Sequence, residues 1–245
     1  TNGVFINAAV TVNSLAYLQS FNKGIAIAGT GSITANQTTG DVALYAQNTA
    51  NGSISGLGNI TGRGLTIFTG TTAALNIASN VSTVTTLIPG NLTLSNARSL
   101  IIDTALAVGG EVSIATTGTG SDLTIVGTPN LSGPTTNLSL SASGNLTASS
   151  DVNVPGNVSL ISTGGCISIP TSAVRARGGR LDAVAETGLT LGTSVTASTL
   201  NLATNTGGIL VETQNSVAGG PVTFANATAN SGDVTIAARS GNIVI

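Results

Sequence analysis

The sequence predicts an all-β protein folded as a parallel β-helix, a solenoid of roughly 10–11 coils with about 22 residues in each coil. Three observations predict this fold. Apolar and polar residues alternate in short segments, as in half-buried strands. Glycine, asparagine, aspartate and serine bound each segment and provide turns. The segments also recur at a nearly constant interval. Parallel crossovers are nearly always right-handed, so we expect a right-handed coil.

The clearest segments begin with a turn residue or an apolar residue and last three or four positions. They are residues 41–44, 65–67, 91–94, 111–114, 137–140, 157–160, 180–183, 200–202 and 222–224, and their first apolar positions recur with a mean spacing of 22.5 residues. A second set follows about half a period later, at residues 75–77, 100–102, 123–125, 167–169, 189–191 and 209–211. One such repeat cannot close a core alone, so stacked coils must bury a common aliphatic column.

The whole chain, residues 1–245, is expected to form a single solenoid segment. Residues 1–39 predict less regular opening coils, with an excursion around residues 17–23. Residues 40–245 predict regular repeats, and two long intervals between strands place outward loops near residues 79–89 and 129–136. The last residues, 241–245, end inside a strand pattern without a polar cap. Because solenoids need capped ends, we expect further coils there, or head-to-tail self-association.

Other folds fit the sequence less well. Apolar residues do not recur at helical spacing, and the abundant glycine, threonine, serine and asparagine disfavour helix interiors, which argues against helical repeats. A β-sandwich also has many short strands at regular spacing and remains an alternative, although its strands would be longer and richer in aromatic residues.

The composition restricts the possible partners. Only 7% of the residues are charged, 2% are aromatic, and the formal net charge is −2. No basic stripe is present, so we expect no nucleic-acid partner. No apolar run reaches the length of a membrane helix, so we expect no membrane insertion. The single cysteine, Cys166, excludes a disulfide framework, and its place in a strand pattern predicts a small buried side chain.

A repeated motif, Gly-[Asp/Asn]-Val-x-[Leu/Ile]-x-[Ala/Ser], occurs at residues 40–46, 156–162 and 232–238. This motif resembles the repeats of filamentous haemagglutinin and related bacterial exoproteins of the two-partner secretion type, over most of residues 40–245. The resemblance implies a right-handed parallel β-helix, export to the bacterial cell surface or the medium, and a role as a surface fibre or adhesin stalk. Autotransporter passengers share the fold and are a near alternative.

The densest group of charges is the candidate ligand site, formed by Arg175, Arg177, Arg180, Asp182 and Glu186. Arginine side chains bind carboxylates and other anionic groups in a forked geometry. One hypothesis is therefore an adhesin module that contacts host or matrix glycans here. The other interpretation is a charged loop that keeps a fibre soluble and prevents non-specific strand pairing.

We expect no catalytic residues, no metal site and no cofactor. The nine acidic residues stand mostly at turn positions before strands, where aspartate has a structural role. Asp182 and Glu186 are the only close pair, and a carbohydrate-active enzyme needs two carboxylates that flank one cleft. The sequence has no histidine, and clusters of metal-ligating residues are missing. A structural role is therefore expected, with glycan binding as the alternative and an enzyme as the third reading.

Overall fold

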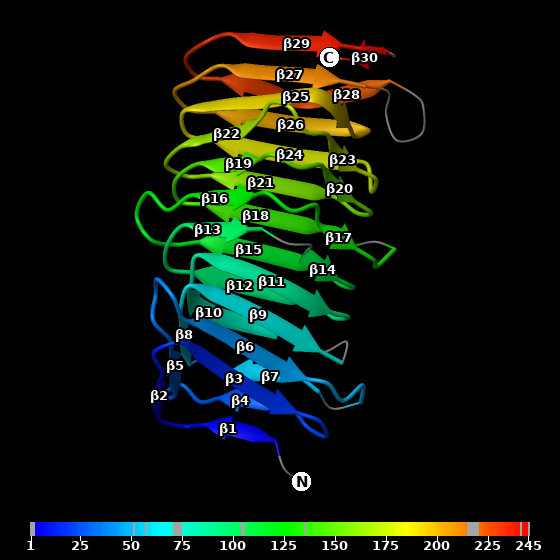
Figure 1. Ribbon diagram of the computed structural model, residues 1–245. Helices are drawn as coiled ribbons and strands as arrows, with labels where there is room; N and C mark the ends of the chain where they lie inside the picture. The colour runs from blue at the N-terminus through cyan, green and yellow to red at the C-terminus, as the bar shows by residue number, and fades with distance from the viewer. Residues whose placement is uncertain are drawn as a thin grey trace.

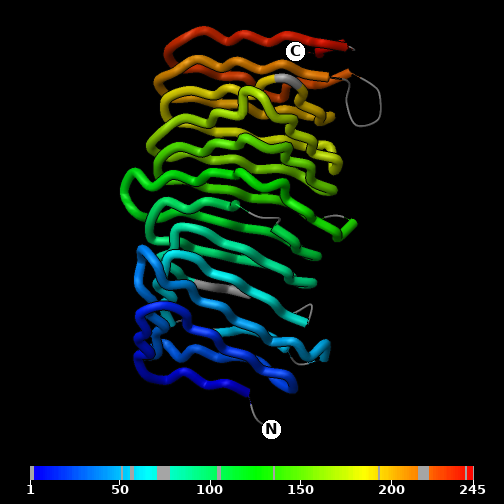
Figure 2. The backbone as a smooth tube through the Cα atoms, viewed as in Figure 1, coloured from blue at the N-terminus to red at the C-terminus, as the bar shows by residue number. Residues whose placement is uncertain are grey.

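The computed structural model describes residues 3–50, 52–56, 58–70, 75–103, 106–134, 136–214, 221–240 and 242–244. In these ranges the chain forms thirty β-strands and no helix. They stack as a β-solenoid of about 10 turns with ~22 residues per turn, and the two ends of the chain lie at opposite ends of the stack (Figures 1 and 2). The front strands of Figure 1 run from left to right as the chain climbs, which is the sense of a right-handed coil. The predicted fold is confirmed.

One sheet of twelve parallel strands, called sheet B here, runs along the solenoid. Its strands, in spatial order, are β2 (Ala9–Thr11), β5 (Ser32–Thr34), β8 (Asn59–Thr61), β10 (Leu75–Asn80), β12 (Leu92–Asn96), β15 (Val112–Thr116), β18 (Leu138–Ala142), β21 (Val158–Ser162), β24 (Arg180–Ala185), β26 (Thr199–Thr204), β28 (Val222–Ala229) and β30 (Ile243–Val244).

A second sheet of fifteen strands, sheet C, also runs along the solenoid. It begins with three six-residue strands, β3 (Leu15–Ser20), β6 (Asp41–Ala46) and β9 (Gly64–Thr69), followed by β11 (Thr83–Ile88). Above β11 it divides into two rows, because β11 pairs with both β13 (Leu100–Ile102) and β14 (Leu106–Val108). The remaining strands are β16 (Leu123–Ile125), β17 (Asn130–Leu131), β19 (Leu146–Ala148), β20 (Val152–Val154), β22 (Cys166–Ile169), β23 (Val174–Ala176), β25 (Gly188–Thr196), β27 (Ile209–Thr213) and β29 (Val234–Ala238).

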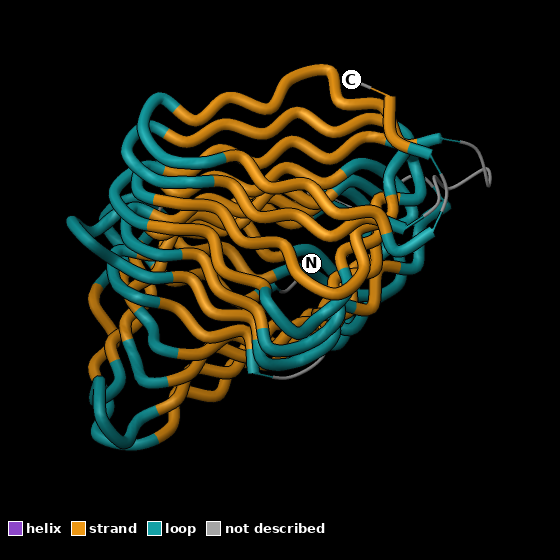
Figure 3. The backbone as a smooth tube through the Cα atoms, turned by 90° about the horizontal axis from the view of Figure 1, so that it is seen from above, coloured by secondary structure: helices purple, strands orange, loops and turns teal. Residues whose placement is uncertain are grey.

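The first coils have a further face. The short sheet A contains β1 (Val4–Ile6), β4 (Ile25–Ile27) and β7 (Ile54–Gly56), which pair in parallel in that order. Strands therefore surround a common interior, as the view from above shows (Figure 3).

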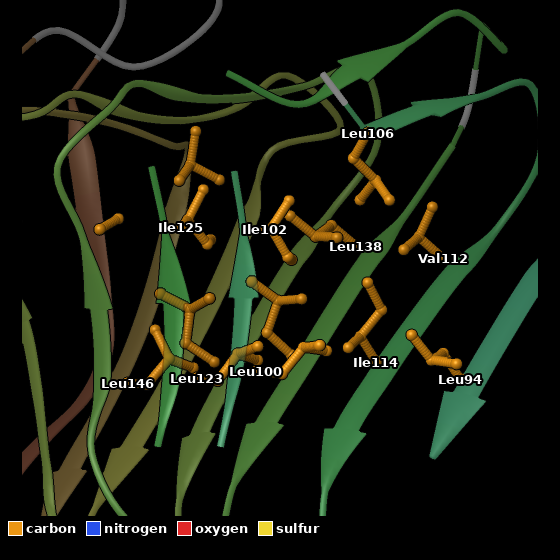
Figure 4. Packing of buried hydrophobic residues seen from close by; sticks show 14 of the residues in the cluster. Leu94, Leu100, Ile102, Leu106, Val112, Ile114, Leu123, Ile125, Leu138 and Leu146 are labelled. Carbon is orange, nitrogen blue, oxygen red and sulfur yellow. The ribbon is translucent and has the colours of Figure 1, made fainter. Parts of the chain in front are cut away.

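The interior is an aliphatic column built by the period-two alternation. In β21, Val158, Leu160 and Ser162 are buried, while Ser159 and Ile161 point outward and are only half-buried. The register places similar side chains of neighbouring coils side by side, since Leu140 of β18 lies directly beside Leu160 of β21. Figure 4 shows leucine, isoleucine and valine side chains from sheets B and C pointing toward one another. Burial of these side chains is the main source of stability, and the outward residues are free to form surfaces.

Three details of the sequence prediction need correction. The recurring segments do not all lie on one face: Val42 and Leu65 belong to sheet C, where the partner of Leu65 is Val84, whereas Leu92 begins the series on sheet B. The long interval after Leu65 therefore reflects a change of face. The prediction of a loop near residues 79–89 is wrong, because β11 occupies most of this range.

The prediction of an excursion around residues 17–23 is also wrong for residues 17–20, because β3 continues to Ser20 in register with β6. The loop expected near residues 129–136 contains the short strand β17, followed by a turn. Thr135 lies outside the described residues, as do Gly241 and Ile245 in the final segment.

Candidate interaction surfaces

The repeated Asp/Asn before each strand has a defined role in the turns. On the way into sheet B, Asn91 Oδ1 accepts a hydrogen bond from the backbone N–H of Glu111, one coil further on, at 2.8 Å. Asn137 Oδ1 accepts from Asn157 N–H at 2.7 Å, and Asn157 Oδ1 from Arg180 N–H at 3.1 Å. These side chains join successive coils at points where the strands have not yet begun to pair.

The same arrangement leads into sheet C. Asp122 Oδ1 accepts from Asn145 N–H at 2.6 Å, and Asn145 Oδ1 accepts from Cys166 N–H at 3.0 Å. Asp41 binds Gly64 N–H at 3.0 Å in the same way. An acidic residue at this position is therefore part of a turn, as the sequence predicts for most of the acids.

Two residues of the predicted charged site lie at β23. Arg175 Nη1 is 3.2 Å from Asp151 Oδ2, which is on the coil below. The pKa of Asp151 is lowered, first by the hydrogen bond from the backbone N–H of Ala173 and then by Arg175. Arg177 Nε donates to Asn153 Oδ1 at 3.0 Å. Both arginines are thus held by residues of the preceding coil.

The other three residues belong to β24 and its end. Arg180 binds Asp182 through two hydrogen bonds, of 2.7 and 2.9 Å, and Asn201 Nδ2 donates to the same carboxylate at 3.0 Å. Arg180 is the main cause of the lowered pKa of Asp182, and the same contact raises the pKa of Arg180. Glu186 accepts a hydrogen bond from Asn205 Nδ2 at 2.7 Å.

The structure therefore brings Arg180 together with Asp182 and places the other charges apart. Arg175 is on a strand of sheet C, whereas Arg180 and Asp182 are on sheet B. Asp182 borders a shallow hollow of about 310 Å³ at the start of the sheet B strands, and Glu186 borders a different hollow at their other end. The two acids that form the close pair in the sequence do not share a cleft.

The hollow beside Asp182 is lined by residues that repeat once per coil. Outward hydroxyls of Thr93, Ser113, Ser139 and Ser159 lie in register along it. None of the four forms a hydrogen bond to the residues that the structure describes. The rows of outward hydroxyls are visible in the sequence, but the hollow that they line is not.

A second surface could not be seen in the sequence. On the outer face of sheet C the rings of Tyr17, Tyr45 and Phe68 form a row: Tyr45 and Phe68 are stacked with centroids 5.9 Å apart, and Tyr17 is tilted against Tyr45 at 5.3 Å. Beside them is a hollow of about 420 Å³ that is bordered by Leu15, Arg63 and Asp103. The only signal in the sequence is the clustering of aromatic residues, since five of the six precede residue 70.

Cys166 differs from its prediction. It is the first residue of β22, where the alternation places Ile167 inward and Cys166 outward, so the side chain is half-buried instead of buried. Its Sγ lies 3.3 Å from Asn145 Oδ1.

Within the described ranges, no three histidine, cysteine, aspartate or glutamate side chains gather in a group suited to a metal ion. In the same ranges, no helix has the length and apolar character needed to cross a membrane.

Comparisons with known proteins give no relative. No family model matches the chain, no curated protein matches it, and no solved structure matches it.

Proposed function

We propose that this chain is a structural segment of a secreted bacterial surface fibre or adhesin stalk. The observation that carries the proposal is the unbroken parallel ladder of sheet B, in which twelve strands from successive coils pair one after another. A ladder of this kind has the shape of a rod, and each coil contacts mainly its neighbours. The motif shared with filamentous haemagglutinin-type repeats supports the same function.

The mechanism would be mechanical. About 10 coils spaced by about 4.8 Å give a rod about 50 Å long. Bending such a rod would open hydrogen bonds along one face, and the buried aliphatic column adds resistance on every face. The segment would therefore hold other parts of the fibre at a fixed distance from the cell. The polar and uncharged outer rows suit this role, since charged residues repeated at strand spacing would repel one another.

Glycan binding through Arg175, Arg177, Arg180, Asp182 and Glu186 is less well supported as the main function. All five residues are already engaged within the protein, and they are distributed over two sheets. Their contacts fit the interpretation in which the charges stabilise turns and keep the rod soluble.

The test combines location and shape. Antibodies against the segment should label intact cells of the producing bacterium, and the purified segment should appear by negative-stain microscopy as rods about 50 Å long. Filaments with that axial repeat would show head-to-tail association of the ends. Labelling only after the cells are lysed would refute the surface role, and compact globular particles would refute the rod.

A further inference from the structure

The hollow on the outer face of sheet C lies over two neighbouring rows of outward residues. Register places Leu15, Asp41, Gly64 and Thr83 in one outward row, and Tyr17, Ala43, Thr66 and Thr85 in the next. Gly64 has no side chain, and a Cβ at this position would meet Asp41 Oδ1 and Thr83 Oγ1, each at 2.9 Å. Ala43 is only 8% exposed although it faces outward. The floor of the hollow is therefore formed by Ala43 and Thr66 and by the Asp41 and Thr83 side chains that close over Gly64.

An aromatic wall stands next to this floor. Tyr17 is the register partner of Ala43, and its ring is tilted against Tyr45, which in turn stacks with Phe68. Tyr17 is 52% exposed and Leu15 54% exposed. The phenol oxygens of Tyr17 and Tyr45 form no hydrogen bond with the residues that the structure describes. None of the three rings borders the hollow itself; Tyr17 stands beside it and presents apolar ring surface and a hydroxyl group at its edge.

Charged groups stand at two sides of the hollow. Arg63 binds Asp41 through Nε at 3.0 Å and through Nη2 at 2.5 Å, and the contact with Asp41 raises the pKa of Arg63. The Arg63 side chain remains about half exposed, and Nη1 is not used in this pair. Asp103 is exposed and pairs with no residue in the described part of the chain. The hollow thus offers guanidinium donors at one side and carboxylate acceptors at another.

Size favours a small ligand over a protein. A volume of about 420 Å³ lies within the range of about 300–1,000 Å³ found for small-molecule sites. The outer face of sheet C continues above β11, so only the hollow itself, and not the whole face, has the size of a small ligand.

The charges around the hollow favour an uncharged ligand over an anionic one. Arg63 and Asp41 neutralise each other, which leaves Asp103 as the net charge at the hollow, so an anionic ligand would be repelled. A ligand with many hydroxyl groups would donate to Asp103, accept from Arg63 and place its C–H groups against Leu15 and Ala43.

We infer that this hollow binds an uncharged saccharide. The inference does not depend on the proposed stalk function, because a rod with or without this site has the same fold. It also differs from the glycan hypothesis drawn from the arginine-rich segment, since it concerns another sheet and a ligand of different charge.

The test is saturation-transfer NMR on the intact chain with five probes. Cellobiose, lactose and N,N′-diacetylchitobiose are uncharged, whereas 3′-sialyllactose and a heparin tetrasaccharide are anionic. At least one uncharged disaccharide should receive saturation, and the anionic probes should receive less. The variant Thr66→Phe should abolish the signal, because a large outward ring on the floor fills the hollow without touching the core.

Arg63→Gln and Asp103→Asn should each weaken binding about tenfold, which corresponds to the loss of one charge-assisted hydrogen bond. Phe5→Ala is the matched control, since Phe5 is the most exposed aromatic residue but lies on sheet A, and it should leave binding unchanged. Circular dichroism of each variant checks that the fold is retained.

Three results would overturn the inference. One is that none of the uncharged disaccharides binds, and another is that binding survives Thr66→Phe in a folded variant. The third is that this face binds a second copy of the chain instead of a saccharide. In that case the chain would self-associate in sedimentation experiments, Thr66→Phe would abolish the association, and no saccharide would bind.

Discussion

Asn145 and Cys166 stand one coil apart, and the side-chain oxygen of Asn145 accepts hydrogen bonds from the backbone N–H of Cys166 at 3.0 Å and from its thiol at 3.3 Å. The backbone contact repeats elsewhere with an aspartate in place of asparagine, as in Asp122 with Asn145 N–H. At these positions the function of the Asp or Asn before the strand is therefore to supply an acceptor to the coil above.

This relationship predicts the effect of changing Asn145. Asn145→Ala removes the acceptor and should lower the free energy of unfolding by about 1 kcal/mol, whereas Asn145→Asp keeps the acceptor but places a carboxylate one coil above Asp122, so it should restore only part of this loss at neutral pH. Urea unfolding of both variants measures the difference as a shift in midpoint. An equal loss of unfolding free energy in the two variants would mean that the acceptor oxygen of residue 145 does not contribute to stability.

Asn96 should be more sensitive. It is completely buried. Its Oδ1 accepts from Ser79 Oγ and Val81 N–H, and its Nδ2 donates to the carbonyls of Val81 and Arg98, all at 2.7–2.9 Å. Asn96→Ala would leave buried backbone groups without partners and should cost about 3 kcal/mol. Thermal unfolding, with the exposed Asn59→Ala as the control, tests this. Similar midpoints for the two variants would contradict it.

The alternation within β21 gives a direct test of which residues point inward. Leu160→Ala should cost about 2–5 kcal/mol because it leaves a cavity in the aliphatic column. Ile161→Ala, one residue further, should cost less than about 1 kcal/mol because the side chain is outward and only half-buried. Denaturant midpoints of the two variants should therefore differ clearly. The reverse order would require the strand to be turned over.

Acid should destabilise the solenoid partly through Asp151 and Asp182. The pKa values of both are lowered in the folded protein. Their contribution is therefore present above the ordinary carboxyl pKa of about 3.9 and is lost as the pH falls through the lowered values. The double variant Asp151→Asn, Asp182→Asn should lose less thermal stability than the wild type between about pH 4 and pH 2.

The measurement is the unfolding temperature at several pH values, with Asp233→Asn as the control, since the Asp233 side chain has no hydrogen bond or ion pair to the described residues. The same slope in the double variant and the wild type would show that these pairs do not contribute.

The period-two pattern was sufficient to predict the strands, because alternation in β12, β15, β18 and β21 reflects burial directly. It was not sufficient to assign them to faces, because an apolar-polar-apolar triplet looks the same on every sheet. The spacing alone therefore puts Leu65 and Leu92 in one series, although they lie on different sheets. Face assignment depends on the lengths of the intervening turns, which vary from coil to coil.

The same limitation hid the aromatic wall. Tyr17, Tyr45 and Phe68 are separated by 28 and 23 residues, and these unequal intervals give no clear repeat. The rings meet because Tyr45 and Phe68 are register partners, whereas Tyr17 reaches Tyr45 diagonally across the sheet. The arginine-rich segment, in contrast, is compact in the sequence but distributed in space, because the chain turns from sheet C to sheet B between Arg177 and Arg180.

The register between β18 and β21 has a consequence for how such a chain can change over time. Leu138 lies beside Val158, and Leu140 beside Leu160. Joining residue 137 directly to residue 158 would therefore excise one complete coil and leave the neighbouring coils with suitable partners. Duplication of the same stretch would add one. Unequal recombination between such positions would adjust the reach of the rod in steps of about 5 Å, without a new core or a new fold.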